Sequence, residues 1–136
     1  SDAECKMLLN RSGKNPLDSV NCIVSKNEFL EMQSKVQNVF VSDDMARYIV
    51  SLILATRKHP LLSRGASPRA TLSLTDMAKA VAFAEGRDYI VPRDVQNIFI
   101  CTVNHRIILN AKASASKKNS EEILHEILRK TPKPRT

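Results

Sequence analysis

One segment of the sequence, residues 42–58, constrains the fold more than any other. Its inward-facing positions recur at the period of an α-helix, and they are Met45, Ile49, Leu52, Ile53 and Thr56. Ser42 can cap the helix start, and the two aspartates that follow favour the positive end of the helix dipole. His59-Pro60 ends the pattern. We therefore predict a long amphipathic helix, which must bury one face against other helices.

The rest of the chain predicts more helices joined by short connections. Apolar spacing and capping residues indicate helices over 4–11, 25–36 and 67–86, and from residues 92 and 119 onward. The inner face of the helix after Ser67 is expected to hold Ala70, Leu74, Met77, Ala78 and Val81. Extended pieces are expected at 39–41 and 89–91, and a linker at Ala111–Ser116. The predicted fold class is all-α, a helical bundle with one or two very short extended segments.

Composition excludes several classes of protein. Three glycines among 136 residues are too few for a fold built on hairpins and tight turns. No apolar run approaches the roughly 18 residues that a membrane span needs. The amino terminus has no signal core, so we expect a cytoplasmic protein. Cys5, Cys22 and Cys101 match no metal-binding spacing, and we expect free, mostly buried thiols and no metal site.

The net charge of +7 first suggests nucleic acid, but its distribution does not favour that partner. Residues 1–41 are balanced, with five basic and five acidic side chains, and residues 42–106 hold nine and six. The last thirty residues hold seven basic and three acidic side chains. This basic stretch has no interleaved aromatic residues on which bases could stack. A solvated surface and tail is therefore expected, and nucleic-acid binding is not.

Only one short segment resembles a chemical site. The chain lacks the GxxxxGK[ST], GxSxG, HExxH and GxGxxG motifs of common enzyme classes. In the segment Arg64-Gly65-Ala66-Ser67-Pro68-Arg69, a glycine loop runs directly into a helix start, with serine as the cap and proline as the first residue. Arg69 would project near the positive end of this helix, where a guanidinium can bind phosphate. A plain surface arginine is the alternative.

Four motifs that occur in one order along the chain indicate a protein family. They are Val41-Ser42-Asp43-Asp44, Ala55-Thr56-Arg57, GASPRA at residues 65–70 and GRDYIVPRDV at residues 86–95. Together they resemble the carboxy-terminal helical lid of MoxR-family AAA+ ATPases. The resemblance covers nearly the whole chain. Val91 departs from the family, which commonly has a threonine-like cap at this position.

The resemblance implies a division of the chain and a role for it. Residues 1–12 would be a remnant of the last helix of the ATPase core, residues 13–110 the AAA+ lid, and residues 111–136 a linker, a helix and a basic tail. Partners implied in the parent protein are the upstream core, a homo-oligomeric ring, commonly hexameric, and proteins with von Willebrand factor A domains. ATP and Mg²⁺ would bind the parent protein and not this fragment.

The resemblance also implies functions for single residues. Arg69 maps onto the sensor-2 arginine, which touches the terminal phosphates of the nucleotide. Arg57, Arg64, Gly65, Ser67 and Pro68 are expected near the nucleotide or in support of it. Arg57 could cap backbone carbonyls or bridge to a carboxylate such as Asp88. The fragment has no Walker A or Walker B motif, so it should be inactive alone.

A stand-alone basic module is the competing interpretation. Such a module would bind nucleic acid or an acidic protein surface through Arg57, Arg64, Arg69 and the basic residues of 117–135. An isolated enzyme is the third and weakest hypothesis.

Overall fold

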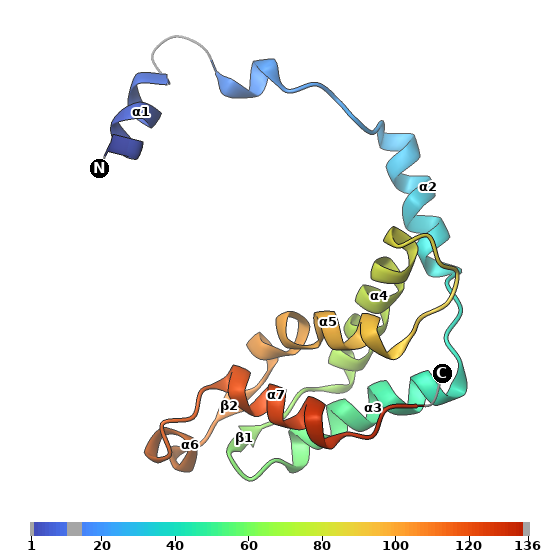
Figure 1. Ribbon diagram of the computed structural model, residues 1–136, viewed down its shortest axis with the longest axis vertical. Helices are drawn as coiled ribbons and strands as arrows, with labels where there is room; N and C mark the ends of the chain where they lie inside the picture. The colour runs from blue at the N-terminus through green and yellow to red at the C-terminus, as the bar shows by residue number, and fades with distance from the viewer. Residues whose placement is uncertain (1, 11–14, 135–136) are drawn as a thin grey trace. The chain divides into compact units, whose positions relative to one another are not determined.

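The computed structural model describes residues 2–10 and 15–134, and α-helices dominate it (Figure 1). The helices are α1 (Asp2–Asn10), α2 (Lys26–Gln37), α3 (Asp43–Lys58), α4 (Pro68–Ala84), α5 (Pro92–Val103), α6 (Ala111–Ala115) and α7 (Ser120–Lys130). Two 3₁₀ turns, η1 (Pro16–Ser19) and η2 (Asn104–Arg106), and two strands, β1 (Leu62–Arg64) and β2 (Ile108–Leu109), complete it. The predicted all-α bundle with very short extended segments is confirmed.

The chain divides into two units, Ser1–Met32 and Gln33–Thr136. In the first unit, every residue whose exposure is described is exposed. Its large apolar side chains include Leu8, Leu9, Ile23 and Phe29, and Ile23 is 93% exposed. The helix predicted at 25–36 is present as α2, which crosses the boundary between the units, and none of its residues is buried.

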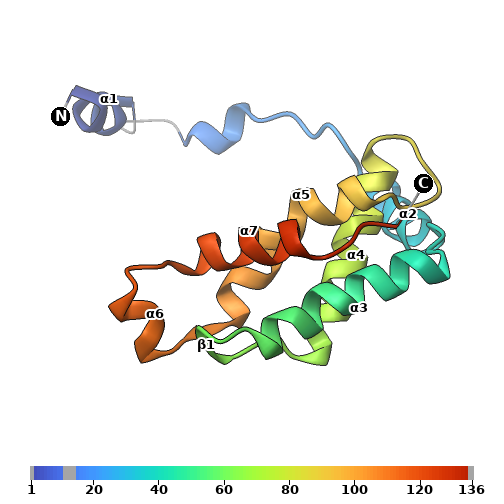
Figure 2. The same ribbon diagram turned by 60° about the horizontal axis from the view of Figure 1, so that its bottom comes forward.

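The second unit holds the hydrophobic core. Helix α4 packs against α3 and α5, and α7 contacts both α3 and α5, which Figure 2 shows from a second direction. The most completely buried large side chains include Phe99, Ile49, Leu52, Ile53, Leu74, Ile123 and Leu124. The predicted inner face of α3 is buried at all five positions, and Tyr48 joins it.

The inner face of α4 differs in part from the prediction. Ala70, Leu74 and Ala78 are buried as expected, but Met77 is 45% exposed and Val81 is only partly buried. Burial follows the strict four-residue row 70–74–78–82, which is mostly alanine. Small side chains in such a row let a neighbouring helix, here α5, approach closely.

Short extended pieces and a short helix tie the bundle together. Strands β1 and β2 pair antiparallel, and Phe40 forms a parallel bridge with Tyr89 between the two predicted extended segments. The stretch expected to be a linker forms α6, so that prediction is wrong. Asn110 accepts a hydrogen bond from the Ala113 amide at 3.1 Å, and Ala113 is fully buried, which holds this turn on the core.

The cysteines also differ from expectation. All three are free, as predicted, but all three are exposed. Cys5 and Cys22 lie in the first unit, whose described residues are exposed, and Cys101 lies on the side of α5 away from the buried Phe99. None of the described helices has the length and apolar character to cross a membrane.

The junction between α4 and α5 contains an ion pair with a fully buried carboxylate. Gly86 adopts φ 75°, the left-handed conformation that ends a helix, and Arg87 follows it. Arg87 donates to both carboxylate oxygens of Asp94, at 2.6 and 2.8 Å, and Asp94 also accepts from the Val91 amide at 2.8 Å. Because Val91 has no polar side chain, Asp94 supplies the polar contact at the start of α5. The bonds with Asp94 and Glu85 raise the pKa of Arg87.

Asp94→Asn should therefore destabilise the bundle strongly. The amide oxygen can replace only one of the two carboxylate oxygens, so the Arg87 bond to the other oxygen is lost, and with it the negative charge opposite Arg87, in a site where Asp94 has no exposed surface. We expect the free energy of unfolding in urea to fall by about 3 kcal/mol. Asp88→Asn, at a neighbouring exposed acid, should change it by less than about 0.5 kcal/mol. Equal effects of the two substitutions would contradict this assignment.

Glu126 on α7 predicts an acid-sensitive contribution to stability. Hydrogen bonds from Lys130 at 2.6 Å and Lys118 at 2.9 Å lower the pKa of the Glu126 carboxyl to about 2. A lowered pKa means that the stabilisation is complete above the ordinary value of 4.5 and is lost as the pH falls from 4.5 toward 2.

Urea unfolding of the wild type and Glu126→Gln at pH 6, 4 and 3 tests this assignment. The wild type should be the more stable at pH 6, and the difference should shrink between pH 4 and pH 3, because protonation makes its carboxyl resemble the amide. A difference that stays constant over this range would show that the carboxylate charge does not contribute.

Candidate functional site

The start of α4 is built as the sequence predicts, with one change at its cap. Ser67 is extended (φ −78°, ψ 167°) and Pro68 is the first helical residue, but the Ser67 side chain makes no capping hydrogen bond. Other helices in the second unit differ here, since Ser42, Asn110 and Asn119 all accept from an amide of the helix that they precede. The position of the α4 start is therefore held by other contacts.

Those contacts come from the end of α3. Thr56 is fully buried, and its hydroxyl donates to the Ile53 carbonyl at 2.6 Å and accepts from the Ala66 amide at 2.9 Å. The next residue, Arg57, donates from Nε to the Ala66 carbonyl at 2.7 Å. Two consecutive residues of α3 thus hold both backbone groups of Ala66. We call these two bonds to Ala66 the α3 clamp.

Arg57 was expected either to cap a carbonyl or to bridge to a carboxylate such as Asp88. The carbonyl bond is the one observed, to Ala66, and Arg57 makes no bond to Asp88. Its terminal guanidinium nitrogens make no hydrogen bond or ion pair with the described residues. Arg57 is therefore fixed at its Nε and keeps free donors at its tip.

Gly65 permits the close approach of the loop to α3. A Cβ atom at this position would lie 2.5 Å from the Arg57 Cα and backbone nitrogen, and 2.6 Å from the Thr56 carbonyl carbon. Both neighbours are backbone, so they cannot move aside cheaply. The glycine of GASPRA is required by packing against α3.

Arg69 is the second residue of α4 and is exposed. Over residues 2–10 and 15–134 it has no hydrogen-bond or ion-pair partner. The first turn of α4 contains no acidic side chain, so the positive end of the helix dipole is not neutralised there. Arg69 is thus an available cation at an anion-binding end of a 17-residue helix.

The other predicted residues lie around this point. Ser67 and Pro68 are exposed beside Arg69, and Gly65 is half-buried against α3. Arg64 is exposed at the end of β1, where it pairs with Ile108 in the sheet. The structure therefore places the predicted residues on one loop and helix start, with Arg57 reaching it from α3.

Sequence reasoning missed the function of Thr56. The period of α3 correctly placed it on the inward face, but not its bond to the Ala66 amide. A buried hydroxyl needs hydrogen-bond partners, so a threonine in an apolar stripe directly before an arginine was the available signal.

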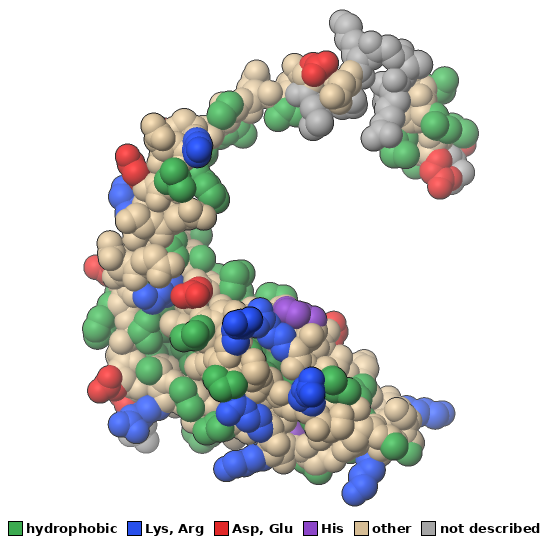
Figure 3. Space-filling model, turned by 180° about the vertical axis from the view of Figure 1, so that it is seen from behind, with side chains coloured by type: hydrophobic (Ala, Val, Ile, Leu, Met, Phe, Trp, Pro, Cys, Tyr) green, Lys and Arg blue, Asp and Glu red, His purple; other side chains and the backbone are tan. Residues whose placement is uncertain are grey.

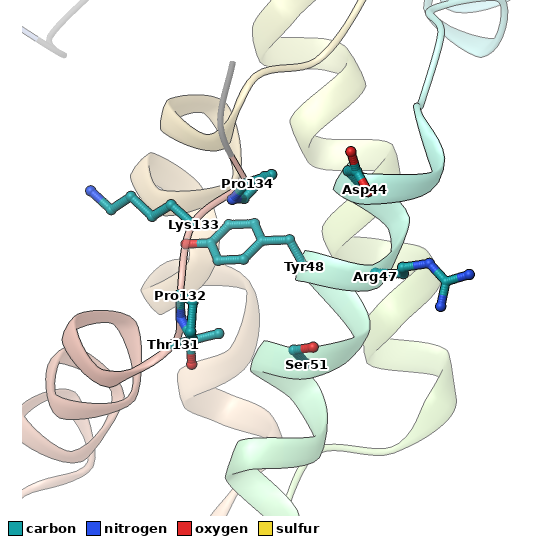
Figure 4. Close-up of a pocket in the computed structure, with 8 residues that line it drawn as sticks. All are labelled: Asp44, Arg47, Tyr48, Ser51, Thr131, Pro132, Lys133 and Pro134. Atoms are coloured by element: carbon teal, nitrogen blue, oxygen red, sulfur yellow. The ribbon is translucent and has the colours of Figure 1, made fainter.

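A separate hollow of about 400 Å³ lies between α3 and the end of the chain (Figure 4). Asp44, Arg47, Tyr48 and Ser51 of α3 line one side, and residues 131–134 line the other. The Tyr48 hydroxyl accepts from Gln96 Nε2 at 3.1 Å, which commits this ring to the core. None of the predicted site residues lines this hollow.

Basic side chains on the face shown in Figure 3 do not gather into one site. On the face shown in Figure 3, lysine and arginine side chains lie in several separate places with apolar and neutral groups between them. Among the residues that the structure describes, no group of three or more His, Cys, Asp or Glu side chains could hold a metal ion.

Comparison with known proteins agrees with the four sequence motifs. The family model for the AAA lid domain matches residues 54–127. The protein YeaC of Bacillus subtilis is 33% identical over 92% of this chain, and the chaperone MoxR1 of Mycobacterium tuberculosis is 30% identical over 98%. The chain spans 39% and 38% of the lengths of these two relatives.

A crystal structure supports the same assignment. It is described as a "putative ATPase" from Cytophaga hutchinsonii, and it superposes with a TM-score of 0.83 at 34% identity. The match covers 98% of this chain and 43% of that one. This chain therefore belongs to the AAA lid domain family, as a lid of the MoxR type.

Proposed function

We propose that this chain is the lid of a MoxR-type AAA+ ATPase and that Arg69 is its sensor-2 arginine. The observation that carries the proposal is the exposed, unpartnered guanidinium at the second residue of α4, on a helix start that α3 holds in place. In the described part of the chain, this arginine has no structural use that would explain its position.

The proposed partner within the same protein is an ATPase core. Relatives of this chain are two to three times its length, and one of them is named a chaperone. The exposed apolar side chains of the first unit need a cover, and a preceding domain would provide it. The site residues include no carboxylate, so Mg²⁺ would be held by the core and not by this chain.

Energies agree with a role that requires the core. A charge-assisted hydrogen bond contributes about 1.5–3 kcal/mol. Even a 1 mM complex needs about 4 kcal/mol. Arg69 alone should therefore not hold ATP measurably. Over a desolvated phosphate, however, a well-placed arginine can change phosphoryl-transfer rates by about 10³–10⁵ at the upper end.

The proposed mechanism is a nucleotide-dependent movement of the lid. Arg69 pairs with the terminal phosphate of ATP and holds the bundle against the core, and hydrolysis releases it. Arg57 supports this contact from α3, and Arg64 lies at its edge. A hexameric ring, client proteins with von Willebrand factor A domains and a cytoplasmic location are proposed from the resemblance alone.

Arg69→Ala in the full-length protein tests the proposal. At saturating ATP, turnover should fall tenfold or more, because the substitution removes a contact made to the reacting phosphate. Arg93→Ala is the matched control, since Arg93 is also exposed and also follows the proline that starts a helix. It should leave turnover within twofold of the wild type, and both variants should keep the helical circular dichroism spectrum.

Two results would contradict the proposal in different ways. An active protein that is unaffected by Arg69→Ala would remove Arg69 as the sensor but keep the lid. A full-length protein without ATPase activity would remove the coupling role. Submicromolar, steeply salt-dependent binding of DNA or RNA would then favour the basic module.

A further inference from the structure

We infer that Thr56 and Arg57 are positioning residues for Arg69, and that the α3 clamp is the path by which force on Arg69 reaches the body of the lid. The inference rests on the proposed function, because it concerns how that arginine is held. The inference gives Thr56 a role in the response of the lid to nucleotide, in addition to its place on the buried face of α3.

A short and stiff stretch of backbone joins the clamp to Arg69. Only Ser67 and Pro68 separate Ala66 from Arg69. The proline ring fixes its own φ, and residues from Pro68 onward are held in the α4 helix. Ser67 is extended, as a residue before proline prefers. Few soft torsions remain, so fixing Ala66 fixes the start of α4.

The start of α4 is not held by a hydrogen bond from its own capping residue. The Ser67 hydroxyl does not bond to the first turn of α4, although serine is among the best capping residues. The clamp provides the missing restraint from outside the helix. The clamp attaches the start of α4 to α3, whereas a capping bond from Ser67 would connect α4 only to its own cap residue.

The clamp uses a polar side chain, Thr56, in a place where an apolar one would pack equally well. Thr56 has no exposed surface and lies among buried apolar residues of α3. Valine has nearly the same shape and would satisfy packing alone. The hydroxyl is needed because the Ala66 amide would otherwise lose its partner.

The clamp also joins Arg69 to the long helix of the lid. Thr56 and Arg57 lie in the last turn of α3, which packs against α4 and α7. When phosphate draws Arg69, the two bonds to Ala66 pass that displacement to α3. The lid then moves as one body, and the α4 start does not move alone.

The test is a double-mutant cycle in the full-length protein with Thr56→Val and Arg69→Ala. Thr56→Val should lower ATP turnover at least fivefold, because an Arg69 guanidinium that is held out of place no longer contacts the reacting phosphate correctly. In the Arg69→Ala background, Thr56→Val should lower ATP turnover by less than twofold. Thr56→Ser, which keeps the hydroxyl, should leave ATP turnover within twofold of the wild type.

Nucleotide affinity separates positioning from general damage. Thr56→Val should weaken binding of a non-hydrolysable ATP analogue and leave ADP binding unchanged, since only ATP has the phosphate that Arg69 contacts. Thr75→Val is the matched control, because the Thr75 hydroxyl bonds only to the Thr71 carbonyl within α4, at 3.0 Å. It should change neither turnover nor affinity by more than twofold.

An exposed variant covers the case in which Thr56→Val does not fold. Arg57→Met removes the Nε donor, keeps the length of the side chain and lies at an exposed position. It should lower turnover at least threefold in the wild type and less than twofold in the Arg69→Ala background. Equal losses in both backgrounds, or equal weakening of ATP and ADP, would overturn the positioning role. If Arg69→Ala does not change ATP turnover, the proposed sensor role of Arg69 fails as well. That result is distinguishable from a failure of the positioning role, because it is obtained with Thr56 and Arg57 unchanged.

Discussion

The position of α4 relative to α3 depends on two hydrogen bonds to one residue, Ala66. Thr56 holds its amide and Arg57 holds its carbonyl, at 2.9 and 2.7 Å. Gly65 makes these bonds possible, because any side chain there would collide with the α3 backbone. The motif GASPRA is therefore a packing motif as well as a candidate phosphate site, and we propose that its first two residues help to position the arginine that follows.

The other end of α4 is fixed by a different kind of contact. Gly86 turns the chain, and Arg87 returns to Asp94 with two charge-assisted hydrogen bonds. The buried Asp94 carboxylate is paired at both of its oxygens, which restrains the junction. Helix α4 is thus restrained at both ends, which is consistent with the proposed movement of the lid as one body.

The sequence predicted most of the helices because their signals are local. Period and capping residues located α3, α4, α5 and α7, and four motifs identified the family. Errors arose where contacts are distant in sequence. The composition of Ala111–Ala115 is typical of a linker, and only the burial of Ala113 in the core shows that this stretch is a packed helix. Met77 fits the helical period but lies outside the narrow alanine row that meets α5. The Thr56 bond joins residues ten positions apart, and no period reports it.

The most direct measurement of the central claim is a structure of the full-length protein with a non-hydrolysable ATP analogue and Mg²⁺ bound. The account predicts that the Arg69 guanidinium lies within hydrogen-bonding distance of the terminal phosphate, about 3 Å, with both bonds to Ala66 intact. An occupied nucleotide site in which Arg69 remains in solvent and another residue contacts that phosphate would contradict it.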